Sequence, residues 1–334
     1  MSQVPRGHDI VVVGASAGGV EALTRLVEGL PPGFAAAVFV VLHMPAEAPS
    51  ALAAILQRFG PLPVMQGEDA QPIERGHIYV ARPNRHLIVH RGRIGVAAGP
   101  RENSARPSID VLFRSAARAY GRRVVGVVLS GTLHDGALGL AAIKMRGGIG
   151  IVQDPNEALF RGMPDSALKS AAIDFCLPAA EIPAQLVELT QPGFEQESMD
   201  TSDPEETAPT EHAADEPDGQ FSPKLPDAAS GLTCPECHGS LWELPDGKSF
   251  RYECRVGHAY GPDALLSEQG EAVEAALWSA INSLQERAAT FRRLQTSASG
   301  GAYPAYAERA ELTERHAATL LRLLRRLIDD YDIG

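Results

Sequence analysis

The fold of the N-terminal half is decided by the stretch Ile10-Val11-Val12-Val13-Gly14-Ala15-Ser16-Ala17-Gly18, after which a helical pattern begins at Val20. The β-branched run predicts a buried parallel strand, and the small residues after it predict a sharp turn into a helix. A serine on such a turn presents its hydroxyl at the sheet edge, where helix N-terminal amides can stabilise an oxyanion. A turn of small residues can equally hold a nucleotide phosphate, so this stretch alone leaves both interpretations open.

The second predicted strand separates these two interpretations. It covers residues 37–42 and runs directly into His43. A dinucleotide-binding fold instead carries an Asp or Glu at the end of its second strand, where it binds the ribose hydroxyls. An imidazole at the carboxyl end of a strand next to Ser16 is a candidate general base. The pattern therefore favours a catalytic serine over a phosphate-binding turn.

A further predicted strand, at residues 124–129, is followed by Ser130-Gly131-Thr132-Leu133-His134-Asp135-Gly136. Asp135 lies beyond the carboxyl end of that strand, at the edge where open α/β sheets bind ligands. A carboxylate there can hold a histidine in the correct tautomer and stabilise its protonated form. An Asp-Gly pair can also simply cap the helix that follows. The combination with Ser16 and His43 favours the catalytic role.

Strand and helix patterns alternate through the first 190 residues, which predicts an α/β fold with a doubly wound, mainly parallel sheet. Residues 86–96 alternate around a glycine turn, and this predicts an added β-hairpin. Cys176, alone in a predicted strand, is expected to be a small core residue. The remaining strands are expected at residues 77–80, 149–152 and 174–177.

The chain has 334 residues, 44% of them hydrophobic, enough for one large core and a smaller module. It contains no apolar stretch of about 20 residues and no signal-peptide pattern, so we expect a cytoplasmic protein that is not membrane-embedded. The net charge is -12, yet residues 191–230 alone hold eleven Asp or Glu and one Lys or Arg. This tract predicts an acidic disordered linker, and the charge gives no support for nucleic-acid binding.

Five ordered blocks stand out along the first half of the chain: VVVGASAGGVEAL at 11–23, VVLHMP at 40–45, RPSIDVLFRSAA at 106–117, VVLSGTLHDGALGL at 127–140 and VQDPNEALFRGMPDSAL at 152–168. Together they resemble the CheB family, the protein-glutamate methylesterases of bacterial chemotaxis. The resemblance implies Ser16 as nucleophile, His43 as base and Asp135 as the residue that orients the base. It implies a carboxylic ester hydrolase that removes methyl esters from glutamyl residues of chemoreceptors without a catalytic cofactor, with glutamine deamidation as a second activity.

Two departures from the family pattern lie close to the predicted site. Family members often carry Thr after the serine and Met in the loop before the aspartate, where Ala17 and Thr132 stand here. We assign Ala17, Gly18 and Thr132 to oxyanion and substrate binding, with contacts that differ in detail from those relatives. Family members also commonly begin with a phospho-receiver domain, and this chain starts almost at the first predicted strand. Phosphorylation control within this chain is therefore not expected.

Three of the four cysteines cluster in the C-terminal half. Cys234 and Cys237 form a C-x2-C pair, and after sixteen intervening residues Cys254 and His258 follow as C-x3-H. Four ligands of this type and spacing suit tetrahedral zinc, and a full set leaves no open position for catalysis. We therefore predict a structural zinc site in a zinc-ribbon-like module, with His238 ranked below His258 as the fourth ligand.

Two long amphipathic patterns follow the metal motif, around residues 273–291 and 317–331. Each apolar face needs a partner. Glycines near residue 300 can turn the chain, so we expect an antiparallel helical hairpin, with dimerisation as the alternative. The hairpin is a candidate contact surface for a regulatory partner.

The predicted organisation is a methylesterase catalytic domain at 1–190, the linker at 191–230, the zinc module at 231–262 and the helical hairpin at 263–334. The alternative to an enzyme is a catalytically inactive signalling adaptor, which would bind partners through the zinc and helical modules. The presence of Ser16, His43 and Asp135 together argues against the adaptor.

Overall fold

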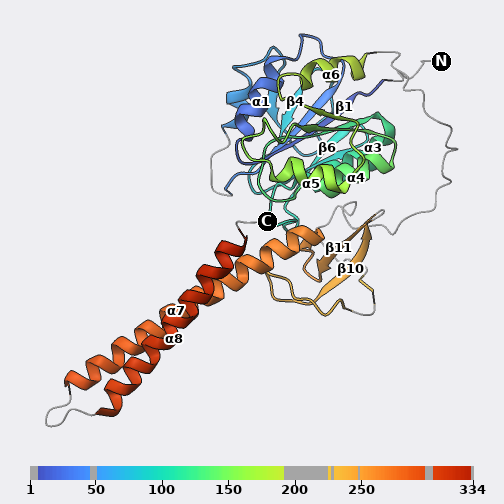
Figure 1. Ribbon diagram of the computed structural model, residues 1–334. Coiled ribbons are helices and arrows are strands. Elements are labelled where there is room, and N and C mark those ends of the chain that lie inside the picture. The colour runs from blue at the N-terminus through green and yellow to red at the C-terminus, as the bar shows by residue number, and fades with distance from the viewer. Residues whose placement is uncertain are drawn as a thin grey trace. The chain divides into compact units, whose positions relative to one another are not determined.

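The computed structural model describes residues 7–45, 51–191, 225–226, 229–246, 249–297 and 304–331. Within these residues, seven parallel strands form the central sheet in the order β3-β4-β2-β1-β7-β8-β9. Figure 1 shows this sheet between its helices. The predicted doubly wound parallel sheet is confirmed. The strands are β1 (Ile10–Ala15), β2 (Ala37–Leu42), β3 (Val64–Gln66), β4 (Ile78–Val80), β7 (Val124–Val128), β8 (Ile149–Gln153) and β9 (Phe175–Leu177).

The sheet is buried on both faces. Val11 and Val13 of β1 point into one core, and Ile10 and Val12 point into the other. This explains why the strands are continuous apolar runs, since apolar and polar residues alternate along a strand only where one face of the sheet is exposed to solvent. The first core is closed by α1 (Gly19–Glu28), α2 (Leu52–Leu56) and α6 (Ile182–Thr190), and the second by α3 (Ile109–Tyr120), α4 (Ala137–Met145) and α5 (Gly162–Ser170).

The predicted hairpin is present as β5 (His86–His90) and β6 (Arg93–Ala97). Its residues Leu87 and Val89 belong to the second core, and the Val89 N–H donates to Ser115 Oγ of α3 at 3.0 Å. The hairpin therefore covers part of the same face as α3. A short 3-10 helix, η1 (Gly121–Arg123), leads from α3 into β7.

The order of the strands predicts where on the sheet a ligand would bind. From β1 the chain moves to β2 on one side, and it later returns to β7 on the other side of β1. In open α/β sheets the crevice for ligands lies beyond the carboxyl ends of the strands at such a reversal. The residues that follow β1, β2 and β7 meet at this edge.

Two details of the sheet differ from expectation. β3 is a strand of three residues at the sheet edge, too short to give a pattern in the sequence. Cys176 is exposed, so its predicted place in the core is wrong. It lies in β9, which is the other edge of the sheet and has β8 on one side only.

The C-terminal part begins with a small antiparallel sheet of β10 (Leu241–Asp246), β11 (Ser249–Cys254) and β12 (Ala259–Tyr260). It belongs to the same compact unit as the parallel sheet, Met1–Leu265. The predicted linker at 191–230 falls mostly outside the described residues.

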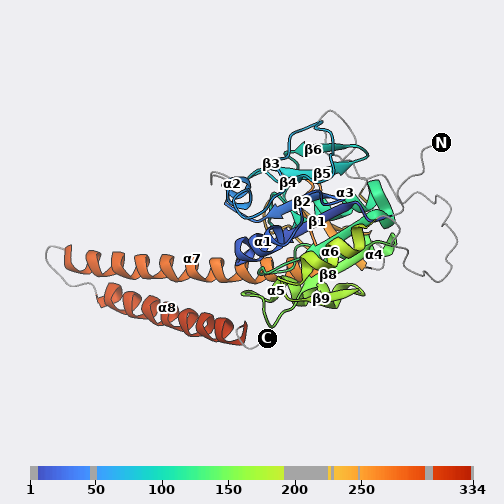
Figure 2. The ribbon, with the colours of Figure 1, turned by 90° about the horizontal axis from the view of Figure 1, so that it is seen from above.

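The second compact unit, Leu266–Gly334, contains most of α7 (Pro262–Ser297) and all of α8 (Pro304–Tyr331). The two helices run side by side in Figures 1 and 2. Arg292 Nη2 pairs with Glu314 Oε2 at 2.9 Å, and the rings of Phe291 and Tyr306 stack with centroids 6.1 Å apart. The helical pair agrees with the predicted hairpin. None of the helices in the described residues has an apolar stretch long enough to cross a membrane.

Candidate active site

Ser16 and His43 occupy equivalent places at the ends of neighbouring strands. In the β1–β2 register Ala15 is paired with Leu42, so Ser16 and His43 are each the first residue beyond that pair. The His43 N–H also donates to the Ala15 carbonyl at 3.1 Å. Since paired strands lie about 4.8 Å apart, the two residues leave the sheet side by side.

Two glycines shape the turn that carries Ser16. Gly18 has φ 70° and is the N-cap of α1, a conformation that favours glycine. At Gly131, an added Cβ would lie 2.1 Å from Met163 Sδ and 2.9 Å from Ser16 Cβ. The loop after β7 can therefore pass close behind Ser16 only with glycine at 131. The Ser16 N–H donates to the Ser130 carbonyl at 3.0 Å and ties the turn to this loop.

His43 is bonded to Asp135. His43 Nε2 lies 2.8 Å from Asp135 Oδ2, and the side chains are 20% and 2% exposed. An ionised carboxylate accepts a hydrogen bond from Nε2–H, so the ring proton lies on Nε2 and Nδ1 is the basic nitrogen. Among the described residues, no hydrogen bond joins Ser16 Oγ to His43. Such catalytic bonds are often long in the absence of substrate.

The Asp135 carboxylate accepts hydrogen bonds from five groups. Burial alone would raise the pKa of Asp135. The hydrogen bond from His43 and the charge of its ring, together with the hydrogen bonds from Asn103 and the Ile109 N–H, hold this pKa below its ordinary value. Asp135 is therefore ionised at neutral pH and can stabilise an imidazolium. The donors are His43 Nε2 at 2.8 Å, Asn103 Nδ2 at 3.0 Å, Ser108 Oγ at 3.0 Å, Ile109 N at 2.6 Å and Asp110 N at 3.1 Å.

Asp135 accepts hydrogen bonds from the start of α3, which contains Asp110, and Asp110 accepts hydrogen bonds from the start of α4, which follows Asp135. Asp135 precedes α4 but accepts from the first N–H groups of α3, where a negative charge is stabilised by the helix dipole. Asp110 lies in the first turn of α3 and accepts from the N–H groups of Gly136 and Gly139 at the start of α4, at 3.0 and 2.6 Å. The structure does not show the alternative role of Asp135 as the cap of α4. The N-cap residue of α4 is Gly136, and the Asp135 carboxylate accepts from the N–H groups of α3 instead.

Burial and the Asp135 charge raise the pKa of Asp110 well above its ordinary value. The two carboxyl groups thus differ in proton affinity, with Asp135 the more acidic. Asn103 Nδ2 donates to both of them, at 2.9 Å to Asp110 Oδ2 and 3.0 Å to Asp135 Oδ1.

The residues assigned to oxyanion and substrate binding lie at the same edge. The Gly19 N–H donates to the Ser16 carbonyl at 2.9 Å, so it is already used. In the described part of the chain, the N–H groups of Ala17 and Gly18 form no hydrogen bond. Thr132 is exposed in the loop after β7. The backbone N–H groups of Ala17 and Gly18 are therefore the donors that a developing oxyanion can use.

Sequence reasoning missed the supporting residues Asn103, Ser108 and Asp110 as parts of the site. Asn103 and Ser108 come from the segment between β6 and α3, which carries no strand end, and Asp110 lies in the first turn of α3. For Ser108 and Asp110 the only signal was the block at residues 106–117, which the family resemblance drew attention to without assigning roles; Asn103 lies outside that block.

The predicted metal ligands come together in the C-terminal sheet. The candidate ligand atoms of Cys234, Cys237, Cys254 and His258 all lie within 4.8 Å of one another. The Sγ atoms of Cys237 and Cys254 are 3.6 Å apart. Tetrahedral zinc with Zn–S bonds of about 2.3 Å separates its ligands by about 3.8 Å.

Two tight turns present these ligands. The His238 N–H donates to the Cys234 carbonyl at 2.9 Å in the first turn, and the Gly257 N–H donates to the Cys254 carbonyl at 2.8 Å in the second. His258 turns Nδ1 toward Cys254 Sγ, at 3.6 Å, while its Nε2 lies 3.4 Å from Glu236 Oε2. A carboxylate on the outer nitrogen is the usual support of a metal-bound histidine. The donor set therefore fits a closed zinc site, and His238 is not in the cluster.

Comparison with known proteins places the first half of the chain among methylesterases. A sequence model of the CheB methylesterase family matches residues 11–186. A provisionally named protein-glutamate methylesterase/protein-glutamine glutaminase of Leptospira interrogans is 35% identical over 190 residues, which are 57% of this chain and 98% of that protein. A protein-glutamate methylesterase/protein-glutamine glutaminase of Anaeromyxobacter dehalogenans is 40% identical over 183 residues, which are 55% of this chain but only 54% of that protein.

A solved structure is also similar. The catalytic domain of the Thermotoga maritima CheB methylesterase superposes with a TM-score of 0.52 and 33% sequence identity, over 54% of this chain and 98% of that domain.

Proposed function

Because the chain belongs to the CheB methylesterase family, we propose that it is a serine hydrolase that removes methyl esters from glutamyl residues of methylated chemoreceptors. Glutamine deamidation by the same site is a second activity of the proposal. The observation that carries it is the His43–Asp135 pair at 2.8 Å beside the strand end that bears Ser16.

In the proposed first step, Ser16 Oγ attacks the ester carbonyl carbon and its proton passes to His43 Nδ1. Asp135 keeps the other ring nitrogen protonated and stabilises the imidazolium that forms. The N–H groups of Ala17 and Gly18 bind the oxyanion of the tetrahedral intermediate. The C–O bond then breaks, and methoxide leaves as methanol with the proton from His43.

The second step repeats the first with water. His43 removes a proton from water, the hydroxide attacks the acyl-serine, and Ser16 Oγ leaves with the proton returned. The product is a free glutamate side chain. No metal or cofactor takes part in this sequence of steps.

Methanol release decides between the enzyme and the inactive adaptor. The full chain, incubated with membranes that contain methyl-labelled chemoreceptors, is expected to release labelled methanol in proportion to protein and time. Heat-treated protein measures the spontaneous hydrolysis. Release no faster than this blank, from receptors of several kinds, would favour the adaptor.

We further propose that Cys234, Cys237, Cys254 and His258 hold one structural zinc ion. The spacing of their ligand atoms and the Glu236 carboxylate behind His258 support this assignment. When bound, the ion would crosslink two turns of a module whose apolar core is small.

Metal content tests the zinc proposal. The purified chain is expected to contain about one zinc per molecule by elemental analysis, and Cys254→Ser is expected to contain almost none, because three ligands hold zinc much more weakly than four. Cys176→Ser, which changes an exposed cysteine outside the cluster, is the matched control and should keep its zinc. A Cys254→Ser protein with as much zinc as the control would contradict the assignment.

A further inference from the structure

Asn103 lies between the Asp135 carboxylate and the small C-terminal sheet that carries the predicted metal ligands. It forms hydrogen bonds with both. The residue is 9% exposed, and its Nδ2 donates to Asp135 and Asp110. On the other side, Asn103 Oδ1 accepts from the Gly261 N–H at 3.1 Å, and the Asn103 N–H donates to the Ala259 carbonyl at 2.8 Å. A carboxamide is suited to this place, because it donates two hydrogen bonds and accepts others.

The module side of this contact is joined to the metal ligands. β12 starts with Ala259, the residue after His258, and its Ala259 N–H donates to the Arg101 carbonyl at 3.3 Å. The Cys254 N–H donates to the His258 carbonyl at 3.0 Å. Tyr260, 1% exposed, fills the module core with its hydroxyl 3.6 Å from Cys234 Sγ. A displacement of the ligands would therefore displace β12.

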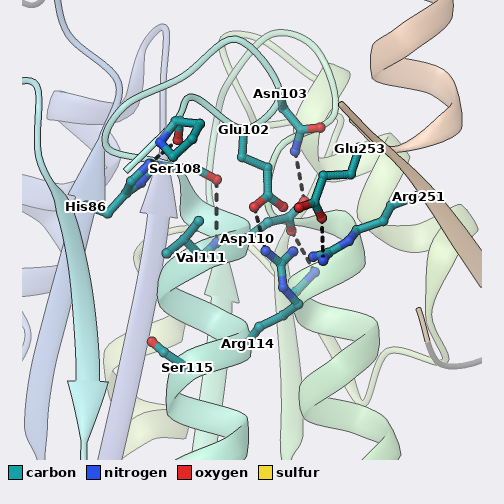
Figure 3. A network of polar contacts seen from close by, with 12 residues as sticks. His86, Glu102, Asn103, Ser108, Asp110, Val111, Arg114, Ser115, Arg251 and Glu253 are labelled. Carbon is teal, nitrogen blue, oxygen red and sulfur yellow. Dashed lines mark hydrogen bonds and ion pairs between the residues drawn. The ribbon is translucent and has the colours of Figure 1, made fainter. Parts of the chain in front are cut away.

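Charged side chains are also buried where the module meets the catalytic domain (Figure 3). Glu102 pairs with Arg114 at 2.5 Å, and Arg251 of the module pairs with Glu253 at 2.8 Å, with all four side chains at most 15% exposed. Burial alone would raise the pKa of Glu102, but the charges of Arg114 and Arg251 keep it low. Arg251 thus helps to balance a carboxylate of the other domain, which favours one docked geometry.

From these contacts we propose that Asn103 is a positioning residue through which metal binding in the module fixes the orientation of Asp135. Bound metal orders His258 and β12, and β12 holds the Asn103 carboxamide with Nδ2 toward Asp135 Oδ1. Asp135 Oδ2 is then aligned with His43. The catalytic consequence rests on the proposed hydrolase activity, and the metal step rests on the proposed zinc site. The coupling between the two sites is a property of binding and is reciprocal, so it can be tested without activity.

Reciprocity gives a test that does not use activity. Zinc affinity of the full chain is measured by competition with a chromophoric chelator, for wild type, Asn103→Gly and Ser104→Gly. Asn103 and Ser104 have φ 50° and 58°, so glycine fits the backbone at either place. Ser104 Oγ has no hydrogen-bond partner in the part of the chain that the structure describes, which makes Ser104→Gly the matched control. Asn103→Gly is expected to bind zinc about tenfold more weakly than the control. Equal affinities would overturn the proposal.

A second measurement observes Asp135 directly. The proton between His43 Nε2 and Asp135 is expected to give a downfield ¹H resonance, assigned by its loss in His43→Gln. Removal of zinc from the wild-type chain should shift or broaden this resonance, and Asn103→Gly should do the same with zinc bound. The wild-type comparison does not depend on the folding of any variant. A resonance that stays unchanged when zinc is removed would refute the coupling.

Kinetics separate this proposal from the proposed function. In the methanol assay, Asn103→Gly should lower kcat about tenfold with little change in KM, because Asp135 acts on the transition state. If wild type releases no methanol, the proposed function fails, while zinc affinity and the resonance still judge the coupling.

Discussion

Ser16→Ala is expected to lower kcat for methanol release by about 10⁶-fold, to the level left by substrate binding and the oxyanion donors. The change removes the attacking oxygen and nothing else of the machinery. The Ser16 N–H bond to Ser130 involves the backbone, and the bond between His43 and Asp135 does not include Ser16. The fold, the zinc content and the affinity for methylated receptors should therefore be unchanged. Labelled methanol released from receptor membranes provides the measurement.

Ser170→Ala is a suitable control, because Ser170 is an exposed serine at the end of α5. It should retain wild-type activity. If Ser16→Ala kept more than about a tenth of the activity, a water activated by His43 would have to be the direct nucleophile, and the acyl-serine step would be wrong.

The central fold was predictable because its signals are local. A strand buried on both faces must be apolar at every position, and β1, β2 and β7 are β-branched or apolar throughout. A parallel sheet then brings the residues after these strands to one edge, which is how Ser16, His43 and Asp135 were selected. The hydrogen bond between His43 and Asp135 was expected from this placement, but the other donors to Asp135 were not predictable from strand ends.

The support of the site was hidden because it depends on contacts between distant segments. Nothing near Asp110 indicates that its carboxylate caps a helix that starts 27 residues later, at Ala137. Asn103 is in an irregular segment, and its partners include Gly261, which is 158 residues away. Periodicity and capping rules describe neighbours along the chain, so such long-range polar bonds appear only when the fold is known.

Asp135→Asn is expected to lower kcat by about 10⁴-fold with the fold retained. Asparagine has the shape of aspartate but replaces one acceptor oxygen with an NH2 donor. Since five donors converge on this group, the NH2 must face one of them. If it faces His43, the ring has to carry its proton on Nδ1 and can no longer accept the proton of Ser16. If it faces the other way, it meets the donors of Asn103, Ser108 and the α3 N-terminus. The methanol assay at saturating receptor measures this loss.

The same substitution has a pH signature in stability. The folded-state pKa of Asp135 is depressed, so its contribution to folding is complete above its unfolded pKa of about 3.9 and is lost as the pH falls through the folded value. The difference in free energy of unfolding between wild type and Asp135→Asn should therefore be large at pH 7 and shrink in acid.

Asp165→Asn, at a surface pair with Arg161, should change activity and stability little. A kcat for Asp135→Asn within tenfold of this control would mean that His43 acts without the carboxylate, which would contradict its proposed role.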